Sequence, residues 1–193
     1  LEALNSSKRY KNLVGYTFGT GFGVGVVIDN RLNRGDNSCV ETFCLRHKKM
    51  PEIIVEEGVA VRAVKRVYGE LANDPNHGLE PKDICEIADG KRPGNVEAAR
   101  QAFAEMGEIA GDAMATAVTL VDGLIVIGGG ITAARKWIMP SLLKELRSKM
   151  HTIAGDELNR VQMKVYDLDD DAEFQEFAKG SMQPLKVYGT DRY

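Results

Sequence analysis

The chain has 193 residues, 44% of them hydrophobic and 27% charged, and its 25 Lys and Arg face 28 Asp and Glu. The resulting net charge of −3 argues against broad binding of nucleic acid, which needs clustered cations. No apolar run approaches the roughly 18 residues of a membrane span, so we expect no insertion into a membrane.

Cysteine usage and the start of the sequence bear on the compartment. Cys39, Cys44 and Cys85 are odd in number and irregularly spaced, unlike a secreted disulfide framework, and no signal peptide precedes them. We therefore expect reduced thiols in a cytoplasmic protein. Because the first residue is Leu1 and not Met, we also expect the chain to be part of a longer protein.

The first part of the chain is predicted to be a strand meander followed by a long loop. Residues 13–18 and 24–28 are short, apolar and rich in aromatic or β-branched types, which predicts two strands. An Asp-Asn pair then signals a turn, after which a third short strand is expected. Residues 35–55 show no period and are expected to form a long functional loop.

The rest of the chain is predicted to alternate helices with strands. A helical period of apolar residues spans 56–71, and the long helix expected over 95–121 carries a stripe of small residues that predicts close packing. Residues 123–127 are entirely apolar, which predicts a fully buried parallel strand. Thr132 can cap a helix that runs to about Met150. Further helices are expected at 81–88 and 169–179, and further strands at 161–168 and 185–188. This order predicts an α/β layer fold with a mixed sheet.

A glycine-rich segment lies between the first two expected strands. Gly19, Gly21 and Gly23 alternate with other residues, which bares backbone N–H groups for close approach by a phosphate, and Thr20 adds a hydroxyl donor. The spacing fits neither the dinucleotide fingerprint nor a Walker loop. A hairpin turn with a glycine bulge explains the same residues, so both interpretations stay open at this point.

A second glycine cluster follows the apolar strand. Gly128, Gly129 and Gly130 precede the helix expected at Thr132. Such a strand–glycine–helix junction aims backbone N–H groups at an anion or a nucleotide, although a tight strand-to-helix turn is the simpler alternative. Two glycine clusters of this kind in one α/β chain favour a nucleotide site.

These residues resemble the ROK family, which contains bacterial sugar kinases and sugar-responsive repressors. Tyr16-Thr-Phe-Gly-Thr-Gly-Phe-Gly-Val-Gly25 resembles the family's phosphate loop, and Leu124-Ile-Val-Ile-Gly-Gly-Gly-Ile131 resembles its adenosine-side motif. The resemblance implies an actin-like ATPase fold with a ribonuclease-H-like lobe, in which a mixed sheet is flanked by helices. It also implies ATP-dependent phosphorylation of a hexose or amino sugar, with Mg²⁺ bridging the phosphates.

The sequence departs from the family's pattern at several positions. The Asn-Asp pair whose Asp is the family's catalytic base would lie upstream of Leu1. We therefore interpret residues 1–193 as the C-terminal lobe and expect the isolated chain to be inactive. The family's cysteine-rich zinc cluster is absent, and Cys44 stands where many members have a zinc-binding His. His47 lies at a different spacing, so we expect no bound metal.

Two carboxylates are candidates for contact with sugar hydroxyls. Arg34-Gly-Asp-Asn-Ser-Cys-Val-Glu41 lies where the family has an Arg-Gly-x-x-Gly-x-x-Gly-Glu stretch, so the resemblance implies that Glu41 contacts the sugar. The family also has a sugar-binding Glu near the start of the following helix, which makes Glu57 the second candidate. A surface carboxylate and an acidic first helical turn are the alternatives.

The leading interpretation is the nucleotide- and sugar-binding lobe of a ROK-type sugar kinase similar to glucokinase. The alternative is the sugar-sensing lobe of a ROK-type transcriptional regulator without kinase activity, and a weaker one is an assembly protein that binds no ligand. In the first two cases we expect the partner to be a small sugar and no nucleic acid to bind through this chain, and the resemblance implies a homodimer.

Overall fold

The fold is seen in a computed structural model that describes residues 10–179. Lys11–Met163 form one compact unit, while Tyr10 and residues 164–179 belong to a second, smaller unit. None of the helices within residues 10–179 combines the length and the apolar character needed to cross a bilayer.

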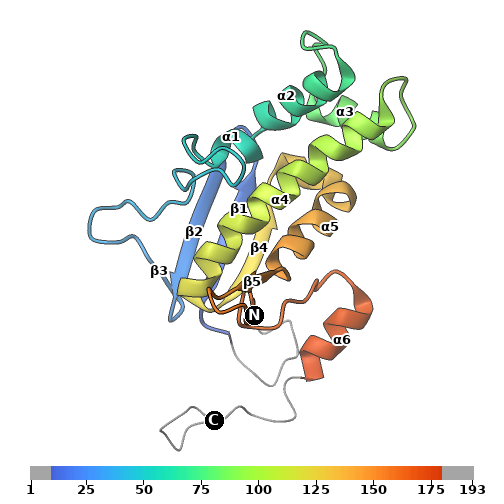
Figure 1. The fold of residues 1–193 in the computed structure, drawn as a ribbon. Helices are drawn as coiled ribbons and strands as arrows, with labels where there is room; N and C mark the ends of the chain where they lie inside the picture. Colours follow the sequence, from blue (N-terminus) through green and yellow to red (C-terminus); the bar gives the residue numbers. More distant parts are fainter. Residues whose placement is uncertain (1–9, 180–193) are drawn as a thin grey trace, which may run out of the picture. The chain divides into compact units, whose positions relative to one another are not determined.

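The larger unit is built on a four-stranded mixed sheet (Figure 1). Strands β1 (Leu13–Phe18), β2 (Phe22–Ile28) and β3 (Arg31–Leu32) form an antiparallel meander, and β4 (Leu124–Gly128) pairs in parallel with β1. Asp29 and Asn30 have φ values of 50° and 62°, as a tight hairpin with matched twist requires. The predicted meander and mixed sheet are therefore confirmed.

The same unit contains six helical segments. They are α1 (Glu56–Val59), α2 (Val61–Ala72), α3 (Pro81–Ala88), α4 (Val96–Val121), the 3₁₀ segment η2 (Gly130–Ala134) and α5 (Arg135–Leu146). The helix expected over 56–71 is thus wrong as a single element, because Ala60 is extended with φ −71° and ψ 167°. At the break the Val61 N–H donates to the Gly19 carbonyl, 2.9 Å away, so α2 begins against the turn between β1 and β2.

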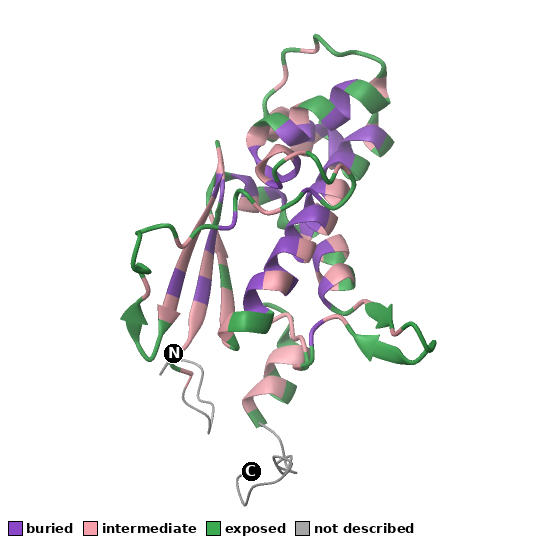
Figure 2. Ribbon diagram, turned by 60° about the vertical axis from the view of Figure 1, so that its left-hand side comes forward, coloured by how far each residue is buried: buried purple, intermediate pink, exposed green. Residues whose placement is uncertain are grey.

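The core lies between one face of the sheet and α4 (Figure 2). Val14, Tyr16 and Phe18 alternate along β1 and are buried together with Phe22 of β2, and the Tyr16 and Phe22 rings stack 5.1 Å apart. Burying side chains of this size stabilises a fold by about 1.5–3 kcal/mol each. The rigid aromatic layer ends where the chain turns from β1 into β2.

The small-residue stripe of α4 brings α5 close. A Cβ atom at Gly107 would lie 2.3 Å from the Ile138 carbonyl oxygen, and one at Gly111 would lie 2.8 Å from that of Leu142. Glycine costs a helix roughly 1 kcal/mol relative to alanine, and here the close packing of α5 offsets that cost. The predicted close packing is confirmed.

Two predictions about the second half of the unit are wrong. The strand expected at 123–127 is not fully buried: β4 lies at the edge of the sheet that the described residues form, and Val126 is 50% exposed. Thr132 does not cap a helix, because its hydroxyl donates to the Gly129 carbonyl at 2.6 Å and the chain continues as η2. The following helix, α5, begins at Arg135 and ends at Leu146 rather than near Met150.

The C-terminal elements were predicted in part. No strand forms over residues 161–168, and a hairpin of β5 (Lys149–His151) and β6 (Glu157–Asn159) precedes them instead. These strands are short and exposed, so they carry no apolar alternation that a sequence pattern could reveal. The acidic helix start is confirmed in α6 (Asp171–Lys179). The strand expected at 185–188 lies outside the described residues.

Candidate functional site

Both glycine clusters lie at the same edge of the sheet. Because β1 and β4 are parallel, their carboxyl ends meet, and Thr17 near the end of β1 pairs with Gly128 at the end of β4. Gly129 follows at φ +102°, where a Cβ atom would lie 2.2 Å from the Phe18 carbonyl oxygen. Only glycine fits this contact, which places the first glycine turn (residues 19–21) beside the second glycine turn (residues 128–130).

The first glycine turn directs its carbonyl groups towards the protein. The Gly19 carbonyl accepts from the Val61 N–H at 2.9 Å, the Gly21 carbonyl from the Gly19 N–H at 3.2 Å, and the Thr20 carbonyl from Arg62 Nη1 at 3.1 Å. Within residues 10–179, the N–H groups of Thr20 and Gly21 have no hydrogen-bond partner. Thr20 is also exposed. All three backbone carbonyls of the turn are thus bonded within the protein, while two of its N–H groups are free to donate, which suits an anion.

Gly23, the fourth nucleotide-binding candidate in this segment, lies inside β2 and not in the turn. It pairs with Thr17, and a Cβ atom there would lie 2.7 Å from Thr17 Oγ1. Close approach of a side chain on the neighbouring strand explains the glycine.

The second glycine turn is closed by Thr132. Its N–H and its hydroxyl both donate to the Gly129 carbonyl, at 3.2 and 2.6 Å. Gly129 and Gly130 are exposed, and a Cβ atom at Gly130 would meet nothing within 4 Å. The space in front of this turn is therefore open.

Glu57 lies in an ion cluster that the sequence analysis did not foresee. Arg62 Nε donates to both Glu57 carboxylate oxygens at 3.0 Å, and its Nη2 lies 2.7 Å from one oxygen of Glu57 and 2.7 Å from one of Glu56. Glu56 Oε2 accepts the Phe22 N–H at 3.0 Å. The guanidinium lowers the pKa of both carboxyls, and the Phe22 N–H helps to lower that of Glu56. No spacing rule finds this cluster, because residues five and six apart are not helical neighbours.

Glu41 lies on an exposed stretch of the long loop. Nearby, the Phe43 carbonyl accepts the Glu56 N–H at 3.3 Å, and the Leu45 carbonyl accepts the Val55 N–H at 2.7 Å. The loop segment that follows Glu41 therefore runs beside the segment that carries Glu57. The structure thus brings the loop segment after Glu41 to the start of α1, and Glu56 of α1 bonds to the Phe22 N–H directly after the first glycine turn.

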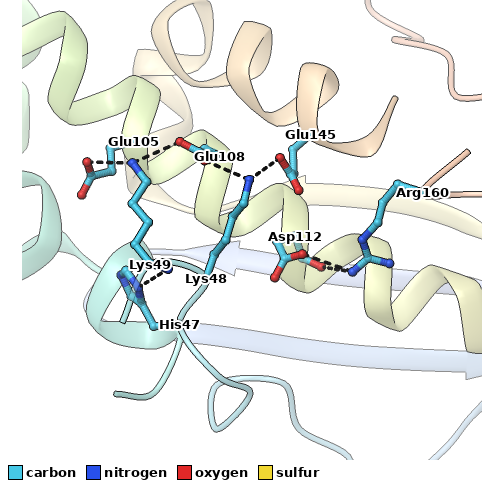
Figure 3. Close-up of polar contacts among 8 residues, drawn as sticks. All are labelled: His47, Lys48, Lys49, Glu105, Glu108, Asp112, Glu145 and Arg160. Carbon is cyan, nitrogen blue, oxygen red and sulfur yellow. Dashed lines mark hydrogen bonds and ion pairs between the residues drawn. The ribbon is translucent and has the colours of Figure 1, made fainter. Parts of the chain in front are cut away.

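His47 is buried and has a structural role (Figure 3). Its Nδ1 accepts N–H bonds from Lys49 at 3.2 Å and Met50 at 3.1 Å, which leaves the proton on Nε2. Nε2 faces Gly58, where a Cβ atom would lie 2.5 Å away. Burial lowers the pKa of His47. The ring thus fixes a tight turn of the long loop against α1.

Ion pairs attach the same part of the loop to α4 and α5. Figure 3 shows Lys48 between Glu108 and Glu145, at 2.9 and 2.6 Å, and Lys49 near Glu105 at 3.0 Å. Within residues 10–179 no group of three or more His, Cys, Asp or Glu side chains is placed to hold a metal. Packing and charge organise this loop, and the absence of zinc stays a prediction.

Comparison with a family model and with solved structures identifies relatives. The model of the ROK family matches residues 49–174, a stretch that begins after the first glycine turn. The chain is 51% identical to glucokinase from Parabacteroides distasonis, with a TM-score of 0.82. The match covers 99% of this chain and 52% of the glucokinase. A search of curated proteins found no match.

Two more distant structures share the fold. A ROK family glucokinase from Streptomyces griseus in complex with glucose and AMPPNP is 23% identical, with a TM-score of 0.57 over 74% of this chain and 52% of that one. A ROK family transcriptional regulator, a homolog of the Escherichia coli MLC protein, is 21% identical, with a TM-score of 0.61 over 71% of this chain and 38% of that one. The predicted actin-like ATPase architecture, with its mixed sheet and helices, is confirmed. The chain spans about half the length of the glucokinases it matches.

Proposed function

The chain belongs to the ROK family, and from this premise we propose that it is the C-terminal, nucleotide- and sugar-binding lobe of a sugar kinase. The observation that carries the proposal is the shared edge of the sheet, where two glycine turns lie side by side and the backbone of the first has free N–H donors but no free carbonyl. The 51% identity to a glucokinase supports a kinase over a regulator.

The proposal assigns the nucleotide to the two turns. The N–H groups of Thr20 and Gly21 and the Thr20 hydroxyl suit phosphate oxygens, while the open second glycine turn suits the adenosine side. ATP is the proposed phosphate donor, in keeping with the AMPPNP complex of the S. griseus glucokinase. Mg²⁺ would neutralise charge on the phosphates when bound.

The proposal assigns the sugar to the region of Glu41 and Glu57. A carboxylate accepts hydroxyl hydrogens in charge-assisted bonds, which are about twice as strong as neutral ones. A sugar held there would lie next to the turn that we assign to the phosphates, as transfer requires. Because the chain spans about half the length of its glucokinase relatives, the catalytic base is assigned to the other half.

A coupled ATP-consumption assay with a panel of hexoses and amino sugars tests the proposal. The complete protein should consume ATP only when the right sugar is present, and the 193-residue chain alone should not. Removal of a general base alone typically lowers a rate by 10²–10⁴-fold. Sugar-dependent turnover by the isolated chain would contradict the lobe assignment. Sugar binding by the complete protein without turnover would favour the regulator.

The sugar assignment has its own test. Glu41→Gln keeps the shape of the side chain but turns one acceptor into a donor, so sugar affinity should fall by about 1.5–3 kcal/mol while AMPPNP affinity stays unchanged. Calorimetric titrations of the complete protein with the preferred sugar and, separately, with AMPPNP measure the two affinities. Equal sugar affinities would remove Glu41 from the site and leave Glu57 as the candidate.

A homodimer, a cytoplasmic location and the lack of nucleic-acid binding through this chain stay predictions.

A further inference from the structure

One guanidinium group joins the first glycine turn to both carboxylates at the start of α1. Arg62 donates to the Thr20 carbonyl through Nη1 and to Glu56 and Glu57 through Nη2 and Nε, with distances of 2.7–3.1 Å. The side chain comes from the first turn of α2, directly after Val61, whose N–H holds the Gly19 carbonyl.

Glu56 completes the attachment from the other end of the turn. Its Oε1 accepts from Arg62 at 2.7 Å and its Oε2 accepts the Phe22 N–H at 3.0 Å. Gly21 passes so close that a Cβ atom would lie 2.8 Å from Glu56 Oε2. The turn is therefore held on both sides, at the Thr20 carbonyl and at the Phe22 N–H.

The charge of Arg62 affects how well an anion can bind at the turn, because it neutralises Glu56 and Glu57. Without Arg62, Glu56 and Glu57 would lie near the turn without the guanidinium that pairs with both of them, and carboxyl groups are ionised near neutral pH. They would repel a phosphate and would no longer be tied to the Thr20 carbonyl. A freed carbonyl could turn its oxygen towards the ligand, where it would also repel phosphate oxygens.

Given the proposed function, we infer that Arg62 is a positioning residue for the phosphate-binding turn. Its role is to orient the turn and not to bind the substrate itself. It holds the Thr20 carbonyl towards the protein, so that the Gly21 N–H of the same planar peptide faces outwards, and it neutralises the carboxylates beside the turn. The Val61 N–H does the same for the Thr20 N–H, because it holds the Gly19 carbonyl. Glu56 acts with it by fixing the Phe22 N–H.

The test compares Arg62→Met with Arg66→Met in the complete protein. Arg66 lies one turn further along α2 and pairs with Glu70 at 3.0 Å. It affects Glu57 only through space, so its removal deletes the same charge without breaking a bond to the turn. Arg62→Met should weaken AMPPNP binding and raise the KM for ATP by about tenfold, with a smaller change in kcat. Arg66→Met should change neither by more than about twofold.

Arg62→Lys separates charge from the shape of the guanidinium. Lysine keeps the positive charge but cannot hold the carbonyl and both carboxylates at once, so its AMPPNP affinity should lie between wild type and Arg62→Met. It also serves if Arg62→Met does not fold. Amide hydrogen exchange at Phe22 and Val61 gives a second readout, and it should speed up in the Arg62 variants only.

The outcomes separate this inference from the proposed function. If the wild-type protein binds AMPPNP but phosphorylates no sugar, the proposed kinase function is wrong. The role of Arg62 can then still be tested by comparing the AMPPNP affinities of the Arg62 and Arg66 variants. Normal turnover in wild type, with equal AMPPNP affinity in the Arg62 and Arg66 variants, overturns the role of Arg62. Absence of AMPPNP binding to wild type overturns both.

Discussion

At the first glycine turn the backbone is held by side chains from α1 and α2, whereas at the second it is held by direct contact between neighbouring strands. Arg62 and Glu56 bond the first turn through charged groups. Gly129 of the second turn fits against the Phe18 backbone, which leaves no space for a Cβ atom. A turn held by steric fit tolerates no larger residue, while a turn held by ion pairs responds to charge and to the protonation of its surroundings.

The largest effect is expected at the second glycine turn. Gly129→Ala places a Cβ atom 2.2 Å from the Phe18 carbonyl at a φ of +102°, so the fold should lose about 3 kcal/mol of unfolding free energy. Urea denaturation of the chain measures this. Gly130→Ala is the matched control, because a Cβ atom there meets nothing within 4 Å. Equal stabilities of the two variants would show that the strand contact does not hold the turn.

A smaller effect, on binding rather than folding, is expected at the first glycine turn. Gly21→Val would displace the flexible Glu56 carboxylate, whose Oε2 lies 2.8 Å from the Cβ position, and release the Phe22 N–H. AMPPNP binding to the complete protein should weaken by more than about 1 kcal/mol, the typical contribution of one hydrogen bond. Gly19→Ala, where a Cβ atom meets nothing within 4 Å, should cost less. Unchanged AMPPNP affinity in a folded Gly21→Val protein would return the segment to a plain hairpin.

The smallest expected effect is a dependence of the free energy of unfolding on pH. It arises at His47, which packs on Gly58 of α1, the helix whose Glu56 holds the first glycine turn. Burial lowers the pKa of His47 below the ordinary 6.5, although Glu105 opposes the shift. The unfolded chain therefore binds more protons than the folded one just below pH 6.5. As a result, the contribution of His47 to the free energy of unfolding is complete above that pH and is lost as the pH falls below it. Protonation would also remove the Nδ1 acceptor for Lys49 and Met50.

Urea midpoints at about pH 7.5 and about pH 5.5 check this dependence. His47→Asn keeps an acceptor but does not titrate, so it should flatten the profile, while His151→Asn on the exposed β5 should not. A wild-type profile that is already flat would mean that His47 does not control the loop.

The sequence predicts the local elements of this fold better than their context. Residues 13–18 and 81–88 form the expected strand and helix because their patterns are short-range. The break at Ala60 could not be predicted, since it depends on a bond between Val61 and Gly19, which are far apart in the chain. The exposure of β4 likewise depends on which strands lie beside it, and an apolar run alone does not predict whether a strand lies at the edge or in the centre of a sheet.

In the candidate site, too, the local motifs could be predicted from the sequence but their spatial arrangement could not. Both glycine clusters were visible as sequence motifs, but their meeting at one edge follows from the parallel pairing of β1 with β4. Arg62 carried no signal, because its partners lie across a helix break and on a distant turn. The roles of Glu41 and Glu57 stay predictions.

The break at Ala60 also restricts the length of the chain at this point. Arg62 reaches the first turn only because α2 starts at Val61 with one particular rotation about its axis. One residue inserted at the start of α2 would turn the following side chains by about 100°. Arg62 would then point away from Thr20, although no side chain had been replaced. Insertions and deletions between Glu56 and Arg62 should therefore be tolerated less than in the exposed stretch around Glu41.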